Sequence, residues 1–222
     1  YGGVKIEKQI KSLKKGPQIV VGTPGRTNDL IRRKKLIIGN IDRLILDEAD
    51  EMLSMGFKED LEAIIQQTPK KKQILLFSAT MTQKVVGVTK KYMKNSLEIA
   101  VARVNRAADN VEHIYYVVKP RDRYEVVKRI ADMNPDIYGI VFCRTRRETK
   151  DIAIKLMNDH YNADTIHGDL SQSERDDVMR RFRKGQLQIL VATDVAARGL
   201  DVEDLTHVIN YNLPDDDEIY IH

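Results

Sequence analysis

The sequence predicts an α/β fold in two domains, in which parallel sheets are flanked by helices. Short apolar runs, rich in β-branched residues, recur along the 222 residues. Amphipathic stretches with helical periodicity lie between these runs. A polar stretch without periodicity then divides the chain into two parts that show the same alternation. Alternating strands and helices are typical of parallel sheets joined by right-handed crossovers.

The apolar runs are nearly continuous, which is typical of strands covered on both faces of a parallel sheet. Buried strands are expected at 19–21, 44–46, 74–77, 140–142, 189–191 and 208–209. Helical periodicity and apolar stripes predict helices at 82–93 and around 124–131, 152–156 and 178–182.

The polar break coincides with a change in the sign of the charge. Residues 1–103 carry a net charge of +9 and residues 104–222 a net charge of −5, which together give the +4 of the whole chain. We interpret 104–112 as a linker between a first domain, 1–103, and a second domain, 113–222. A basic first half suits an acidic partner such as nucleic acid, although a well-solvated surface explains the same charge.

Composition excludes several other classes of protein. The single cysteine, Cys143, permits neither an internal disulfide nor a multi-cysteine zinc site. No apolar run reaches the roughly 18 residues of a membrane-spanning helix, and the first residues do not resemble a signal peptide. We therefore expect a cytoplasmic protein without membrane association. His167 lacks a companion His or Cys at ligand spacing, so no metal site is expected there.

An acidic tetrad, Asp47-Glu48-Ala49-Asp50, directly follows the expected strand 44–46. Carboxylates beyond the carboxyl end of a parallel strand lie where α/β proteins bind ligands. One carboxylate can hold Mg²⁺ through its water shell, and a neighbour can orient an attacking water. Asp47 suits the first role and Glu48 the second, although a solvated acidic turn is the simpler interpretation of the tetrad alone.

Further motifs accompany the tetrad in a fixed order. Thr23-Pro24-Gly25-Arg26 precedes it, and the segments that follow it are Ser78-Ala79-Thr80, 192–201 and 220–222. This ordered set resembles the DEAD-box family of ATP-dependent RNA helicases. The resemblance implies two RecA-like domains that use ATP and Mg²⁺ and bind single-stranded or duplex RNA. Because the chain opens on a Tyr-Gly-Gly turn and closes where a new element begins, both domains are expected to be incomplete.

In the first half, the resemblance implies two groups of residues around the tetrad. The expected contacts with the RNA backbone are Gly2, Gly3, Thr23, Pro24, Gly25 and Arg26. A helix start followed by an arginine attracts phosphate, whereas a glycine pair alone is usually a turn. Asp50, Ser78 and Thr80 are implied to couple the ATP state to domain closure. Hydroxyls after a strand can instead cap the next helix.

In the second half, the implied residues again form two groups. RNA contacts are implied for Arg144, Thr145, Gly168, Asp169, Gln172, Arg175, Thr193 and Asp194. ATP and cleft contacts are implied for Arg198, Gly199, Asp201 and His222. Ser171 and Glu174 also predict a capped helix start near the first group, and the structural and functional interpretations are compatible.

Two parts of the family's machinery are not in this sequence. No Gly-Lys dipeptide occurs, so there is no Gly-x-x-x-x-Gly-Lys-[Ser/Thr] loop to hold the β- and γ-phosphates. The arginines that follow the histidine in the family's last motif are not in the sequence either. We therefore expect residues 1–222 alone to bind ATP poorly and not to hydrolyse it.

The predicted function of the parent protein is ATP-dependent unwinding or remodelling of short RNA duplexes, coupled to closure of two domains on single-stranded RNA. A non-catalytic RNA-binding or scaffolding module is the alternative. A DNA-directed helicase is less consistent with Asp50, because relatives with other substrates usually have histidine there. The RNA target and any ribonucleoprotein or RNA-decay partners are left open.

Overall fold

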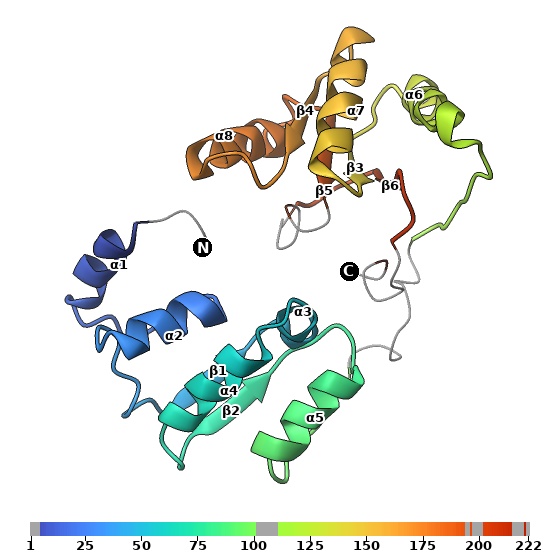
Figure 1. The fold of residues 1–222 in the computed structure, drawn as a ribbon. Coiled ribbons are helices and arrows are strands. Elements are labelled where there is room, and N and C mark those ends of the chain that lie inside the picture. The colour runs from blue at the N-terminus through green and yellow to red at the C-terminus, as the bar shows by residue number, and fades with distance from the viewer. Residues whose placement is uncertain (1–4, 101–110, 194–195, 197–201, 215–219, 221–222) are drawn as a thin grey trace. The chain divides into compact units, whose positions relative to one another are not determined.

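A computed structural model describes residues 5–100, 111–193, 196, 202–214 and 220. The chain forms two compact units (Figure 1). Unit 1 consists of residues 1–108 with 221–222, and unit 2 of residues 109–220. Most of the expected linker, 104–112, lies outside the described residues, so the domain boundaries remain proposals.

Unit 1 contains a parallel pair of strands and five helices among its described residues. Its elements are α1 (Ile6–Leu13), α2 (Pro24–Arg32), β1 (Arg43–Leu46), α3 (Ala49–Ser54), α4 (Lys58–Gln67), β2 (Gln73–Leu76) and α5 (Gln83–Tyr92). Strand β1 pairs with β2 from Arg43 opposite Gln73 to Leu46 opposite Leu76. Both strands therefore end at the same edge, directly before the acidic tetrad and the Ser-Ala-Thr segment.

The core of unit 1 lies between the strand pair and the helices. Because strand side chains alternate between faces, Leu44 and Leu46 join residues of α3, α4 and α5 in one apolar cluster. The intervening Ile45 is 56% exposed. A second cluster joins α1 and α2 to Ile64 of α4. The expectation that β1 is covered on both faces is wrong, because its described neighbours cover one face only.

The prediction of a strand at 19–21 is also wrong. Residues 19–21 have no strand assignment, and Ile19 and Val21 are 82% and 91% exposed. An apolar run becomes a strand only where a neighbouring strand accepts its backbone hydrogen bonds. Among the described residues the sheet of unit 1 consists of β1 and β2 alone. Composition by itself does not supply such a partner.

Unit 2 contains a larger parallel sheet. Its elements are a 3₁₀ turn (Pro120–Asp122), α6 (Arg123–Met133), β3 (Gly139–Cys143), α7 (Arg146–Asn158), β4 (Ala163–Ile166), α8 (Gln172–Arg183), β5 (Ile189–Thr193) and β6 (His207–Asn210). The strand order is β4-β5-β3-β6, and all three pairings are parallel. The sequence did not predict β4, because Ala-Asp-Thr-Ile is not an apolar run.

Helices cover both faces of this sheet. Val141 and Val191 face a cluster formed with α6 and α7, whereas Ile140 and Leu190 face a cluster formed with α8. Strand β5 is buried along its whole length. The expected strands at 140–142 and 189–191 are therefore confirmed, as is their burial on both faces.

The expected helices are confirmed, and so are several of their starts. Pro24 occupies the first turn of α2, and the hydroxyl of Thr82 caps α5 by accepting from the Val85 N–H. Ser171 and Glu174 form a reciprocal capping box at the start of α8. Within the described residues, no helix combines the length and the apolarity needed to cross a membrane.

Candidate functional site

The first two residues of the acidic tetrad lie exposed beyond the carboxyl end of β1. The Asp47 carboxylate accepts a hydrogen bond from the Glu48 N–H at 3.0 Å. The Ala49 N–H donates to the Phe77 carbonyl at 3.0 Å, so a hydrogen bond joins the segments that follow β1 and β2. Two exposed carboxylates are thus held at a rigid strand edge.

Glu48 has a left-handed backbone conformation, with φ 51° and ψ 49°, at the N-cap of α3. For a residue with a Cβ atom this conformation costs about 1–2 kcal/mol. Strained residues of this kind persist where the surrounding structure determines them, and they cluster at functional sites. The strain falls on the residue for which the sequence predicted a water-positioning role.

The third carboxylate of the tetrad is buried and fully engaged. Asp50 is 4% exposed, and its Oδ2 atom accepts from the Thr80 N–H at 2.7 Å and from the Thr80 hydroxyl at 2.6 Å. The Ser78 hydroxyl donates to the Thr80 carbonyl at 2.8 Å and accepts from the Asp50 N–H at 3.3 Å. The structure therefore brings together Asp50, Ser78 and Thr80, which are about 30 residues apart in the sequence.

The electrostatics of Asp50 follow from this network. Burial raises the pKa of a carboxyl group, but the hydrogen bonds from Thr80, Ser78 and the backbone outweigh it and leave the Asp50 pKa below its ordinary value. Asp50 is therefore ionised at neutral pH. The alternative that Ser78 or Thr80 caps the next helix does not hold, because Thr82 is the cap of α5.

The tetrad suits a magnesium ion held mainly by water and phosphate oxygens. Mg²⁺ in phosphate-transferring sites is bound through one or two carboxylates and keeps several waters. Asp47 offers one exposed carboxylate for that purpose. Within the described residues, no group of three or more His, Cys, Asp or Glu side chains forms an all-protein metal site. Asp47 therefore remains a proposed outer ligand.

The Thr-Pro-Gly-Arg segment forms the start of α2. Thr23 is the N-cap and is exposed, and Pro24 follows it in the first turn. Arg26 donates from Nη1 to the Gln9 side-chain oxygen of α1 at 2.6 Å. A helix start beside an arginine is suited to an anion. No sequence pattern indicated a role for Gln9, because its contact with Arg26 depends on how α1 and α2 pack.

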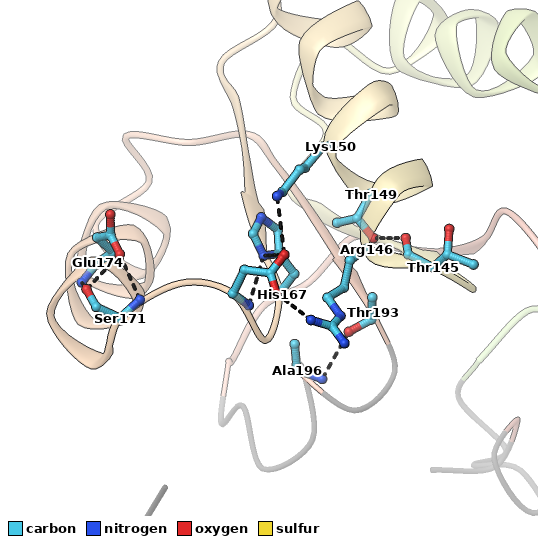
Figure 2. Close-up of polar contacts among 10 residues, drawn as sticks. Thr145, Arg146, Thr149, Lys150, His167, Ser171, Glu174, Thr193 and Ala196 are labelled. Atoms are coloured by element: carbon cyan, nitrogen blue, oxygen red, sulfur yellow. Dashed lines mark hydrogen bonds and ion pairs between the residues drawn. The ribbon is translucent and has the colours of Figure 1, made fainter. Parts of the chain in front are cut away.

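In unit 2, candidate residues gather at the carboxyl ends of β4 and β5 (Figure 2). The Thr193 hydroxyl accepts from the Ala196 N–H at 3.3 Å, and Arg175 of α8 donates to the Ala196 carbonyl at 2.9 Å. Thr193 and Arg175 therefore both bind the backbone of Ala196. The structure brings these two expected residues together.

A cluster of two cations from α7 and one carboxylate from the loop after β4 lies beside them. Arg146 and Lys150, one turn apart on α7, both pair with the Asp169 carboxylate, and Lys150 does so at 3.3 Å. Hydrogen bonds from Arg146 and then Lys150 hold the Asp169 pKa below its ordinary value. Figure 2 shows Arg146 and Lys150 reaching from α7 toward the loop that carries His167. Neither cation was predicted from the sequence, although their i, i+4 spacing was a usable signal.

His167 is the buried residue next to this cluster. It is 3% exposed, and its Nδ1 atom accepts from the Asp169 N–H at 3.3 Å. Burial, with Lys150 next in importance, lowers the pKa of His167. The neutral imidazole ring of His167 therefore positions the backbone of Asp169.

Arg144 and Thr145 lie at the start of α7, where Thr145 caps the helix by accepting from the Glu148 N–H at 3.2 Å. Arg144 donates from its guanidinium to the Leu213 carbonyl at 3.2 Å. Both residues line an open pocket of about 390 Å³ whose other walls include Tyr211 and Asn212. These two residues are separate from the Asp169 pairing, and the pocket is bordered by both cations and carboxylates.

The remaining expected residues fall into two groups. Gly168 is exposed in the loop after β4, and the Gln172 amide donates to Asp176 along α8. Outside the described residues lie Gly2, Gly3, Asp194, Arg198, Gly199, Asp201 and His222.

Two family models match the chain in the order that the motifs predicted. The model of the DEAD/DEAH box helicase matches residues 1–88, and the model of the helicase conserved C-terminal domain matches residues 122–222. The chain belongs to the DEAD-box helicase family.

Curated DEAD-box relatives match over the whole chain. The DEAD-box ATP-dependent RNA helicase CshA of Streptococcus pneumoniae is 48% identical over 222 residues, which are 42% of that protein. The ATP-dependent RNA helicase CshA of Listeria monocytogenes is 44% identical and is covered to 43%. The chain thus spans about two-fifths of the length of these relatives.

Solved DEAD-box structures match the fold. Saccharomyces cerevisiae Dbp5 bound to RNA and ADP BeF3 superposes with a TM-score of 0.81 and 32% identity, covering 92% of this chain and 54% of Dbp5. A DEAD box protein of Methanococcus jannaschii is 48% identical with a TM-score of 0.51, covering 100% of this chain and 59% of that protein. The expected RecA-like α/β fold, with parallel sheets flanked by helices, is confirmed.

Proposed function

We propose that the protein containing this chain is an RNA-stimulated ATPase that unwinds or remodels short RNA duplexes. The observation that carries the proposal is the network that ties Asp50 to Ser78 and Thr80. It fixes the acidic tetrad to the segment after β2, so a change at one strand end is transmitted to the other. Family membership and the names of the curated relatives support the same conclusion.

In this proposal the tetrad serves ATP hydrolysis. Asp47 would help to hold Mg²⁺, which would neutralise charge on the phosphates. Glu48 orients the attacking water and accepts its proton as the bond from water oxygen to the γ-phosphorus forms, while the bond from the γ-phosphorus to the bridging oxygen breaks and ADP leaves. Its exposure at the strand edge and its constrained backbone suit a group that must meet a ligand in one geometry. Arg198, Gly199, Asp201 and His222 are proposed to contact ATP or the cleft.

RNA is proposed to bind mainly through its sugar-phosphate backbone, without much sequence preference. The proposed contacts are Gly2, Gly3, Thr23, Pro24, Gly25, Arg26, Arg144, Thr145, Gly168, Asp169, Gln172, Arg175, Thr193 and Asp194. The helix start at Thr23–Arg26 and the cations near Asp169 support this assignment. Dbp5 with RNA and ADP BeF3 is a solved relative in a ligand-bound state.

ATP binding and RNA binding are proposed to be coupled through a shift in the populations of the open and closed states. ATP and RNA both favour a closed arrangement of the two domains, so each raises the affinity for the other. Closure distorts the bound strand and separates a short duplex locally, and hydrolysis restores the open state. RNA affinity is expected to fall steeply with salt, because backbone contacts release counterions.

The test is ATP hydrolysis by the full-length protein, with and without single-stranded RNA. Glu48→Gln should lower turnover by about 100-fold or more, since a positioned general base contributes at least that much, while RNA binding stays intact. Glu59→Gln is a matched control, because Glu59 is an exposed glutamate on α4 of the same unit. Residues 1–222 alone should show no turnover in the same assay.

Absence of hydrolysis by the wild-type full-length protein, with RNA binding retained, would overturn the ATPase proposal. That result would favour the non-catalytic RNA-binding or scaffolding module. Equal loss of turnover in Glu48→Gln and Glu59→Gln would instead remove the specific role proposed for Glu48.

A further inference from the structure

Helix α1 has one basic face and one apolar face. Lys8 and Lys11 lie three residues apart in α1 and so on one side of the helix, while Lys5 is the N-cap and Lys15 follows the C-cap. All four are exposed. On the opposite side, Ile6, Ile10 and Leu13 pack against the buried cluster of α2 and α4. We call these four lysines the α1 lysine face.

The α1 lysine face does not serve the stability of unit 1 through ion pairs. Within the described part of the chain, none of its four ammonium groups is within ion-pair distance of a carboxylate. Other cations of the same unit are paired, such as Arg33 with Asp29 and Lys91 with Glu62. Residues 5–15 carry five exposed lysines and one exposed carboxylate, that of Glu7, so this surface is strongly basic although it is not of a single sign.

The α1 lysine face is connected through Gln9 to Arg26, which the proposed function uses. Gln9 is next to Lys8 on α1 and lies on the helix side between the lysines and the apolar residues. Its side-chain oxygen accepts from Arg26 Nη1 at 2.6 Å. The α1 lysine face therefore borders the start of α2, where Arg26 is the proposed phosphate ligand.

We propose that the α1 lysine face binds backbone phosphates of the RNA that Arg26 contacts, and so lengthens the RNA-binding surface of unit 1. Lys8 and Lys11 are about 4.5 Å apart along the helix axis, which suits contact with neighbouring phosphates. Ammonium groups on flexible stems bind phosphate as point charges without reading bases. This inference rests on the proposed RNA binding at Thr23–Arg26.

The test compares charge removal on this face with equal removal elsewhere in the same unit. The full chain carries Lys8→Gln/Lys11→Gln in one variant and Lys70→Gln/Lys71→Gln in the control. Lys70 and Lys71 are exposed residues between α4 and β2. Glutamine and lysine have similar helix propensity, so α1 should remain folded. Circular dichroism checks this point.

Affinity for a single-stranded RNA oligonucleotide is measured across a series of salt concentrations. Lys8→Gln/Lys11→Gln should weaken binding at low salt and reduce the slope of log K against log[salt] by about 1.4, or 0.7 for each lost contact. The control variant should leave the slope unchanged. Lys8→Arg/Lys11→Arg should restore wild-type affinity and slope, because it keeps both charges.

Arg26→Ala separates this inference from the proposed function. Weaker binding in Arg26→Ala with no change in Lys8→Gln/Lys11→Gln would overturn the lysine-face proposal and leave the proposed function standing. No change in either variant would overturn both RNA assignments. Equal weakening by the lysine variant and its control would show a general charge effect and would also overturn the proposal.

Discussion

Asp50 of unit 1 and Asp169 of unit 2 are held in opposite ways. Both lie just beyond the carboxyl end of a parallel strand, and both have a pKa below the ordinary value. Asp50 is 4% exposed and accepts from hydroxyl and backbone donors without charge. Asp169 has a side chain that is 45% exposed and pairs with Arg146 and Lys150. One carboxylate is built into the core and the other into a solvated ion cluster.

This difference indicates what each carboxylate can do. Removing a partner from a buried, hydrogen-bonded charge leaves unsatisfied groups, which costs the full desolvation penalty. Exposed ion pairs are worth little, since water and salt replace the lost partner. The Asp50 network therefore suits rigid transmission between strand ends. The Asp169 cluster can open at little cost, so its cations can exchange a carboxylate for a phosphate.

The largest effect is expected for Asp50→Asn. The amide keeps the shape of the side chain but loses the charge, and its NH₂ group can face the donors of Thr80. Unit 1 should lose about 1.5–3 kcal/mol of unfolding free energy, the range for hydrogen bonds to a charged group. Urea denaturation followed by circular dichroism measures the loss. Asp42→Asn, an exposed residue before β1, is the matched control; an equally large loss in that variant would contradict the prediction.

An effect of intermediate size on the free energy of unfolding is expected for Thr80→Val, and this effect should depend on pH. Because the folded pKa of Asp50 is lowered, its contribution to stability is complete above the unfolded value near 3.9 and is lost as the pH falls through the folded value. Thr80→Val removes the hydroxyl at 2.6 Å and should cost about 1 kcal/mol at neutral pH. The difference in unfolding free energy between Thr80→Val and wild type should stay constant above pH 5 and shrink below pH 4. A difference independent of pH would mean that the hydroxyl does not act through the Asp50 charge.

The smallest effect is expected for Asp169→Asn. Its ion pairs are exposed, so the urea midpoint of the full chain should not shift measurably, in either low or high salt. The same Asp-to-Asn change thus separates a buried network from a solvated cluster. A shift as large as that of Asp50→Asn would break the comparison between the two units.

The sequence predicted more of unit 2 than of unit 1. In unit 2, the runs at 140–142 and 189–191 became central strands covered on both faces, because neighbouring strands and helices are all among the described residues. In unit 1, the equally apolar run at 19–21 is exposed and has no strand partner. A hydrophobic run reports that burial is favourable, but a strand also needs a partner for its hydrogen bonds.

Features that depend only on residues close together in the sequence were determined by the sequence alone. The motifs stand directly after β-branched runs, and Pro24, Thr82 and Ser171 begin helices because their preferences act within one turn. Only the tertiary structure decided which distant groups meet, such as Asp50 with Thr80 and Gln9 with Arg26. Such contacts depend on the register of strands and the packing of helices. Those are set by the whole core, so no local pattern specifies them.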